Sequence, residues 1–256
     1  MIDYFNGMIE NKHTFDSYNR AVAHFFEWCG INDDAVNHIA FVNQFMVEKY
    51  IDYLKNERHL APSTLNIVSS ALIRYGKTKG VRFDVTNTPK IVHDNPEILS
   101  EKEIMTVIDS ITDPRDKVMM MLMYDSALRI SEVINLNCDD IDLNNQLIHL
   151  SHRKMHSAPQ AVPFGKKTKK FLMKYMKERE IRGFGEKAFP ELFIGAGGRI
   201  DPATIRMHIR HYSEKRIGTR ITPHQLRHSR ASHLRNNGVS IEMLREFSGI
   251  QVSTAL

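Results

Sequence analysis

Cysteine and tryptophan are scarce in this sequence. Its 256 residues include one tryptophan and two cysteines, and Cys29 and Cys138 lie far apart in the chain. Neither cysteine belongs to a CxxC pair or to another spacing typical of metal ligands, which leaves no basis for a disulfide framework or a zinc site. We expect both cysteines to be small packing residues.

Long apolar runs are also missing. None approaches the ~20 residues that a membrane-spanning helix needs, and the N-terminal stretch MIDYFNGMIENK has neither the basic start nor the apolar core of a signal peptide. We therefore expect a cytoplasmic protein that has no membrane partner. Hydrophobic residues make up 42% and charged residues 25% of the chain, which excludes a wholly disordered or collagen-like protein.

Acidic residues become rare toward the C-terminus. Residues 1–92 have a net charge of 0 and residues 93–150 of −8, whereas residues 151–256 carry 21 basic and eight acidic side chains, a net charge of +13. Lysine and arginine side chains that neutralise phosphates supply most of the affinity of a protein for nucleic acid. The charge pattern predicts either a surface that binds a polyanion or a solvated basic face, and composition alone does not separate the two.

The periodicity of apolar residues predicts two domains. Helical spacing over 14–28, over 45–54 and after Pro62 indicates a small helical bundle in residues 1–83. Residues 84–99 contain two prolines and little periodicity, as expected of a linker. Residues 100–256 form the second domain. The predicted fold class is mainly α with a small antiparallel β-sheet (α+β).

The second domain is predicted to be mostly helical. Ser100 and Glu103 form a capping-box pattern that opens a helix through Ile111, Asp113 precedes a further helix, and the apolar run Val118–Met123 is expected in the core. Short segments of β character and further helix starts follow. The predicted strands are 141–143, 147–150, 160–164 and 192–194, and the predicted helices are 166–179 and those that begin at Asp201 and Thr222.

The segment TPHQLRH has the composition of a phosphate-binding helix start. Thr222 and Gln225 form a capping-box pattern around Pro223, so His224 and Arg227 lie three residues apart near the N-terminus of a helix. Free backbone N–H groups, an imidazole and a guanidinium together suit an anion such as phosphate. An isolated HxxR pattern is nevertheless common by chance.

Two other places in the second domain carry candidate cations. Arg129 interrupts apolar surroundings in YDSALRISEV and is interpreted either as an ion-pair partner of Glu132 or, if buried, as a ligand of an anion. Arg153 and Lys154 lie in the polar turn between two predicted strands. A cation there is either solvated or able to enter a DNA groove or donate a proton.

Taken together and in this order, ALRISEV, a lysine on a hairpin and PHQLRHSRASHL resemble the tyrosine recombinase (phage integrase) family, which includes the Xer-type enzymes. TFDSYNRAVAHFFEWC and LAPSTLNIVSSALIRYGK resemble the family's core-binding helices, and NPEILSEKEI resembles its interdomain connector. The resemblance covers nearly the whole chain. It implies a SAM-like, DNA-binding core domain in residues 1–83 and a catalytic domain in 100–256, which clamp double-stranded DNA between them.

The resemblance also implies a mechanism. Motif by motif, Arg129, His224 and Arg227 surround the scissile phosphate, and Lys154 acts as general acid toward the leaving 5′-oxygen, with Arg153 as the alternative. A tyrosine attacks to form a 3′-phosphotyrosine link, with no cofactor or metal, in a site-specific recombinase or integrase that acts as a homotetramer on two duplexes. His228 is expected to pack against its own domain.

The sequence departs from the family pattern near its end. Ile250 follows Gly249 where the family has a histidine, and no tyrosine follows Tyr212. A sequence that stops before its last helix, a nucleophile from another polypeptide and a degenerate relative each explain this, and we expect the first, a catalytic domain that lacks its tyrosine-bearing segment. The alternative function is a catalytically incomplete DNA-binding protein that occupies recombination sites. A type IB topoisomerase fits this N-terminal domain less well.

Overall fold

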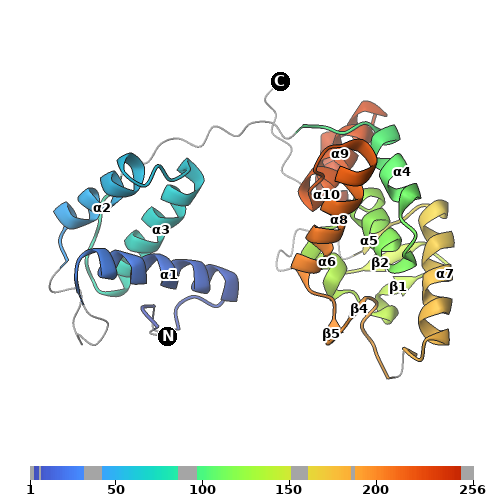
Figure 1. Ribbon diagram of the computed structural model, residues 1–256, viewed down its shortest axis with the longest axis horizontal. Helices are drawn as coiled ribbons and strands as arrows, with labels where there is room; N and C mark the ends of the chain where they lie inside the picture. Colours follow the sequence, from blue (N-terminus) through green and yellow to red (C-terminus); the bar gives the residue numbers. More distant parts are fainter. Residues whose placement is uncertain are drawn as a thin grey trace. The chain divides into compact units, whose positions relative to one another are not determined.

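The computed structural model describes two compact units, residues 1–94 and 95–256 (Figure 1). The residues that it describes are 3–5, 7–31, 42–85, 97–150, 161–185 and 188–248. Each unit has its own hydrophobic core. The predicted linker, 84–99, spans the division between the units, and most of it lies outside the described residues.

The described part of the N-terminal unit contains three helices, as the sequence predicts. Asn11 and Asn43 cap the first two by accepting hydrogen bonds from backbone N–H groups of the first turn, and Pro62 occupies the first position of the third. Tyr75 lies at the centre of the core, with its ring edge-on to that of Phe26 at 5.5 Å. The helices are α1 (Lys12–Trp28), α2 (Gln44–Asn56) and α3 (Pro62–Thr78).

The C-terminal unit is built around a helix that is buried on all sides. The helix that precedes this central helix begins with the predicted capping box. Glu103 N–H donates to Ser100 Oγ at 3.2 Å, and Ser100 N–H donates to Glu103 Oε2 at 2.9 Å. Residues Val118–Met123 of the central helix are each 2% exposed or less, which confirms their predicted place in the core. The helices are α4 (Glu101–Ser110), α5 (Pro114–Asp125), α6 (Ile130–Asn135), α7 (Lys166–Ile181), α8 (Pro202–Ile217), α9 (Pro223–Asn236) and α10 (Ile241–Ser248).

The central helix α5 packs against both α7 and α9 and lies in the interior of this unit (Figure 1). Asp125, the last residue of α5, accepts hydrogen bonds from Gly165 N–H and Thr168 Oγ1, both at 2.6 Å. The same residue pairs with Arg230 of α9 at 3.3 Å. The turn that follows α5 is therefore held from two sides.

The sheets are small and antiparallel. In the first, Ile148 pairs with Ile141 on one side and Val162 on the other, so β2 lies in the middle. The connection from β2 to β3, residues 151–160, lies outside the described residues. A second sheet is a short hairpin. The strands are β1 (Ile141–Asp142), β2 (Leu147–His149), β3 (Ala161–Pro163), β4 (Ile194–Gly195) and β5 (Gly198–Arg199), with a short 3-10 helix, η2 (Cys138–Asp140), before β1.

The predicted fold class, mainly α with a small antiparallel sheet, is confirmed. The predicted strand over 192–194 is wrong in its position: Leu192 and Phe193 are buried, and the pairing begins at Ile194 opposite Arg199. The helices α6 and α10, the 3-10 helix η2 and the strand β5 were not predicted. In the part of the chain that the structure describes, no helix is long and apolar enough to cross a membrane.

Candidate active site

The start of α9 is fixed by its own sequence. Gln225 N–H donates to Thr222 Oγ1 at 3.1 Å, and Thr222 N–H donates to Gln225 Oε1 at 2.9 Å, which completes the predicted capping box. With Pro223 in the first turn, the helix begins where the sequence predicts. The capped start determines which way His224 and Arg227 point.

Arg227 is the buried arginine of the site. Its side chain is 3% exposed, donates a hydrogen bond to the carbonyl oxygen of Ala127 and lies 3.8 Å from Glu132 Oε2. Ala127 has a φ of 49° in the turn after α5, a left-handed conformation that an alanine adopts at a cost. This turn brings the Ala127 carbonyl to Arg227, about a hundred positions further along the chain.

Arg129 begins the helix α6 and pairs with Glu132. Its backbone N–H donates to Glu132 Oε2 at 2.7 Å, and its Nη1 donates to Glu132 Oε1 at 2.9 Å. The side chain is 47% exposed. Of the two interpretations from sequence, the ion pair with Glu132 is confirmed, and the guanidinium is not buried. Because Glu132 faces both Arg129 and Arg227, this one carboxylate links the two predicted arginines.

The positive charges of Arg129 and Arg227 act on the imidazole of His224. Burial, with the positive charges of Arg227 and Arg129, lowers the pKa of His224 below its usual range. Its Nε2 lies 2.8 Å from the Nε2 of His228, one turn later on α9. His228 is half-buried, and burial together with the charges of His224 and Arg227 lowers its pKa too. The sequence predicts only a packing role for His228, whereas the structure also places its ring in contact with His224 of the site.

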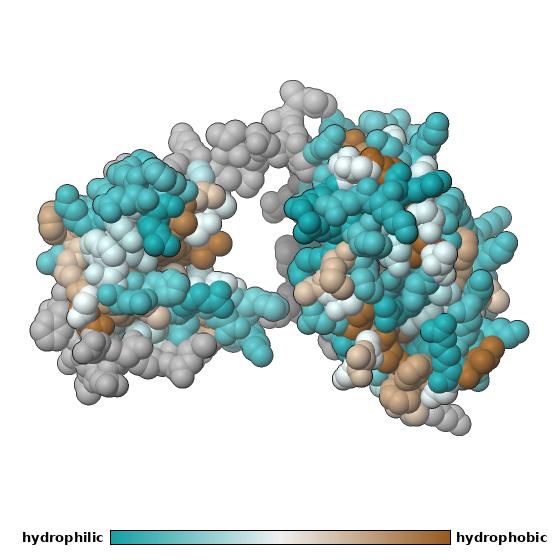
Figure 2. Space-filling view, viewed as in Figure 1, coloured by the Kyte–Doolittle hydropathy of each residue, from teal (hydrophilic) through white to brown (hydrophobic). Residues whose placement is uncertain are grey.

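These residues meet at one pocket. A cavity of about 570 Å³ is lined by Arg129, His224 and Arg227, which the sequence singled out, and by three arginines that it did not. Those three are Arg206, Arg210 and Arg220, and none of the described residues that line the cavity is acidic. A lining of guanidinium and imidazole groups that contains no carboxylate of its own suits an oxyanion ligand. Hydrophilic side chains cover most of the visible surface of this unit (Figure 2).

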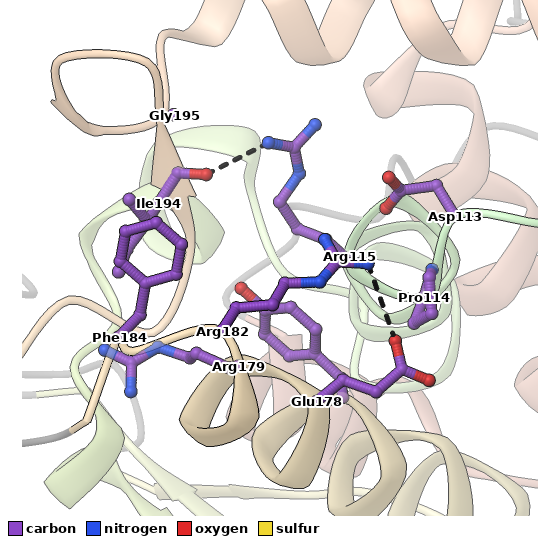
Figure 3. A pocket seen from close by; sticks show the side chains of 10 residues that line it. Asp113, Pro114, Arg115, Glu178, Arg179, Arg182, Phe184, Ile194 and Gly195 are labelled. Carbon is purple, nitrogen blue, oxygen red and sulfur yellow. Dashed lines mark hydrogen bonds and ion pairs between the residues drawn. The ribbon is translucent and has the colours of Figure 1, made fainter.

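A second pocket lies at the opposite, N-terminal end of α5 (Figure 3). It measures about 230 Å³ and also contains arginines, but carboxylates and carbonyls face them. Arg115 donates to the carbonyl of Ile194 at 3.0 Å, and Arg182 lies 4.0 Å from a carboxylate oxygen of Glu178. Because the carboxylates of Asp113 and Glu178 belong to its lining, this pocket is a weaker candidate for an anion.

The remaining predicted residues lie outside the described part of the chain. Lys154 and Arg153, the two candidates for the general acid, fall within 151–160, and Ile250 falls within 249–256. Their predicted roles therefore stay predictions. Among the described residues, no three histidine, cysteine or acidic side chains gather in a group that would hold a metal ion.

All eight tyrosines belong to the described residues, and none lines the arginine pocket. The three in the C-terminal unit have other partners. Tyr212 donates to Asp116 at 3.0 Å, Tyr175 donates to the Leu192 carbonyl at 2.9 Å, and the hydroxyl of Tyr124 lies 2.9 Å from His233 Nδ1. Burial raises the pKa of Tyr212 and of Tyr175 to about 12 and raises that of Tyr124 as well. Such phenols are poor nucleophiles.

Solved structures with a similar fold include two proteins in complex with DNA. The structure is similar to that of the Tn1549 transposon integrase in complex with transposon right end DNA, with a TM-score of 0.73 and 18% identity over 96% of this chain and 88% of the integrase. It is also similar to XerH recombinase bound to its difH substrate, with a TM-score of 0.70 and 17% identity over 93% of this chain and 74% of XerH.

Sequence comparison identifies the family. The phage integrase family matches residues 97–252. Tyrosine recombinase XerC of Thermodesulfovibrio yellowstonii is 30% identical over 253 residues, which cover 94% of this chain and 82% of XerC. Tyrosine recombinase XerA of Pyrococcus horikoshii is 27% identical over 246 residues, 94% of this chain and 80% of XerA. The chain belongs to the phage integrase family, and its relatives are tyrosine recombinases of the Xer type, as its motifs predict.

Proposed function

We propose that this chain is a site-specific DNA recombinase and that its C-terminal unit binds the scissile phosphate in the pocket of Arg129, His224 and Arg227. One observation carries the proposal: residues that lie about a hundred positions apart in the sequence line a single pocket, and the described part of that pocket contains no carboxylate. Double-stranded DNA is the proposed partner, since related recombinases have been solved in complex with DNA.

The pocket has the chemistry that phosphoryl transfer requires. The transition state carries negative charge on equatorial oxygens, and preorganised donors at those oxygens stabilise it. Arg227 is held in place by the Ala127 carbonyl and Glu132, so its side chain needs little reorganisation when a phosphate binds. Arg129 is half-exposed and paired with Glu132, and we propose that it turns toward the phosphate when DNA binds.

His224 adds a donor that responds to the ligand. In the free protein, burial and two neighbouring arginines lower the pKa of its imidazole. A bound phosphate has the opposite effect, because a nearby anion favours the protonated ring. We propose that His224 donates to a phosphate oxygen and that Lys154, or Arg153 in its place, protonates the leaving 5′-oxygen.

The family resemblance implies a tyrosine nucleophile next to the pocket. None of the eight tyrosines of the chain lines the pocket. This observation favours a second candidate function for a polypeptide of these 256 residues, namely a DNA-binding protein that occupies recombination sites. Incubation with a nicked duplex, followed by denaturing electrophoresis, tests it: we expect no covalent adduct, and an adduct mapped to any of the eight tyrosines would contradict the assignment.

Assembly belongs to the same proposal. Recombination joins two duplexes, so we propose that two copies of the chain bind each site and that two sites come together as a tetramer. A twofold arrangement of protomers predicts a recognition site made of two inverted half-sites.

Selection from a pool of random duplexes tests the proposed function. Several rounds of binding and amplification are expected to enrich one sequence that contains two inverted half-sites. The variant Arg182→Ala, which alters the second pocket, serves as a control that selects the same sequence. Binding without any enriched sequence would contradict site-specific recombination, and no binding at all would contradict a DNA-directed function.

A further inference from the structure

Three arginines of the pocket have no role in the proposed contact with the scissile phosphate. Arg206 and Arg210 lie one turn apart on α8, and Arg220 lies between α8 and α9. All three are exposed and line the same cavity as Arg129, His224 and Arg227. Six cationic or protonatable side chains therefore face one space.

A single carboxylate holds two of these arginines. Oε1 of Glu214 accepts hydrogen bonds from the Nε of Arg210 at 3.1 Å and from the Nε of Arg220 at 2.6 Å. Both bonds use the inner nitrogen of the guanidinium group. Among the described residues, no hydrogen bond or ion pair engages the terminal nitrogens of Arg210 or Arg220, so the paired donors that fit a phosphate remain available.

Glu214 compensates only part of this positive charge. The side chains of Arg210 and Arg220 are 52% and 62% exposed, and the two arginines lower the pKa of the Glu214 carboxyl. Arg206 has no ion-pair partner in the part of the chain that the structure describes. Three guanidinium groups, of which two share the single carboxylate of Glu214, leave an excess of positive charge that a bound anion would offset.

The cavity also has room for a second anion. At about 30 Å³ for each water-sized group, a phosphate of five heavy atoms takes up about 150 Å³. The cavity of about 570 Å³ is several times larger. One phosphate held by Arg129, His224 and Arg227 would thus leave space beside α8.

We propose that Arg206, Arg210 and Arg220 form a second phosphate subsite, which binds a backbone phosphate next to the scissile one, and that Glu214 positions two of its arginines. The proposal rests on the proposed function, because it assumes that DNA occupies the pocket. Its ligand is a phosphodiester of the DNA backbone, and its role is to fix the strand relative to the reacting phosphate. Backbone contacts of this kind set the register of a protein on DNA.

The salt dependence of DNA binding tests the subsite. The probe is a labelled 30-base-pair duplex of mixed sequence, with affinity measured by fluorescence anisotropy over a series of salt concentrations. Loss of one phosphate contact reduces the slope of log affinity against log salt by about 0.9. The variant Arg206→Ala/Arg210→Ala/Arg220→Ala is expected to bind more weakly, with a slope that is smaller by at least that amount.

A charge-matched control is available on α7. The variant Lys174→Ala/Lys177→Ala/Arg182→Ala also removes three positive charges, from α7 and the residue that follows it, none of which lines the cavity. Its slope is expected to match that of the wild type. Equal slopes for the two triple variants would overturn the subsite. Failure of the proposed function looks different, because the wild type itself would then not bind the duplex. Single replacement of the unpaired Arg206 by alanine, checked by circular dichroism, guards against a folding defect.

The direction in which DNA affinity changes when Glu214 is replaced tests its role. The variant Glu214→Ala removes a negative charge beside the cavity, so charge alone predicts tighter binding of DNA. Loss of positioning for Arg210 and Arg220 predicts weaker binding. We expect weaker binding, with a smaller salt slope, and tighter binding would overturn the role assigned to Glu214.

Discussion

Arg227 and Arg129 contribute to the site in different ways because their burial differs. Arg227 is almost completely buried, and its guanidinium group is fixed by a carbonyl and a carboxylate. Arg129 is half-exposed and pairs with Glu132 at 2.9 Å. The first is therefore part of the protein core, while the second is the arginine that we propose turns toward the phosphate when DNA binds.

This difference predicts unequal effects on stability. The variant Arg227→Ala leaves the Ala127 carbonyl and Glu132 without their buried donor, which costs about 1–3 kcal/mol of unfolding free energy. An exposed ion pair such as that of Arg129 is worth about 1 kcal/mol or less. Urea denaturation of the two alanine variants measures the difference, and equal losses would contradict the distinction.

Ala127 is a second position where one residue determines the site. Its φ of 49° places the backbone of a residue that has a Cβ atom in the left-handed region. We predict that Ala127→Gly raises the free energy of unfolding by roughly 1 kcal/mol, because glycine adopts this conformation without the cost to a Cβ. The fully buried alanine at position 71, on α3, lies in a helix, so Ala71→Gly is expected to destabilise the protein in the same thermal unfolding measurement. A loss of stability in both variants would contradict the argument.

The histidine pair predicts how affinity for DNA depends on pH. Burial and the charges of Arg227 and Arg129 lower the pKa of His224, and burial, His224 and Arg227 lower that of His228. Bound phosphate favours the protonated ring, so binding takes up a proton, and affinity rises as the pH falls toward the lowered pKa of the free imidazole. The steepest change that one proton allows is about tenfold per pH unit.

Comparison with His224→Ala isolates this effect. The other histidines are common to both proteins, so their contributions cancel in the ratio of the two affinities. That ratio is expected to grow between pH 7.5 and pH 5.5. A ratio that stays constant over this range would show that the pair does not take up a proton on binding.

The sequence predicts some residues of the pocket and misses others for a physical reason. His224 and Arg227 follow from a helix start whose capping residues are local, and Arg129 follows from a charge in apolar surroundings. Arg206, Arg210 and Arg220 carry no such signal, because exposed arginines on a helix usually mark a solvated face. Only the packing of α8 beside α6, together with the short connection from α8 to α9 that carries Arg220, brings them to the same cavity.

At the scale of elements, the capped start of α9 is the feature on which the site depends. Thr222 Oγ1 accepts from Gln225 N–H, which fixes the first turn that carries His224. The variant Thr222→Ala is predicted to cost about 1 kcal/mol of unfolding free energy. Affinity for DNA is expected to fall as well, since the first turn frays.

The variant Thr222→Ser separates the cap from other effects. Serine keeps the hydroxyl that accepts the hydrogen bond, so both stability and affinity are expected to stay close to those of the wild type. Denaturant unfolding and anisotropy measure the two quantities. A serine variant as weak as the alanine variant would contradict the role given to the cap.

Helices with clear caps and long apolar stripes could be predicted, whereas the shortest elements could not. The helix α6 has six residues, and β5 consists of Gly198 and Arg199. Such segments are too short to show a period, and their conformation is set by contacts from elsewhere. Arg199, for example, donates to the carbonyls of Ile134 and Leu136 at 2.8 and 3.1 Å.

At the scale of the whole molecule, charge and fold point to the same partner. The net charge of +13 in residues 151–256 suggests a polyanion, and the pocket shows where part of that charge gathers. The alternative, a solvated basic face, explains the charge without the pocket. Convergence of arginines from three separate parts of the chain on one cavity favours a bound phosphate.

A methylphosphonate scan tests the central claim most directly. Each backbone phosphate of the selected duplex is replaced in turn by a neutral methylphosphonate, and the affinity is measured for the wild type, Arg129→Ala, His224→Ala and the control Arg182→Ala. We predict one phosphate whose neutralisation weakens the wild type and the control but has little further effect on Arg129→Ala or His224→Ala, because each variant has already lost that contact. If no phosphate shows this coupling, or if Arg129 and His224 couple to phosphates far apart, the pocket does not hold the scissile phosphate.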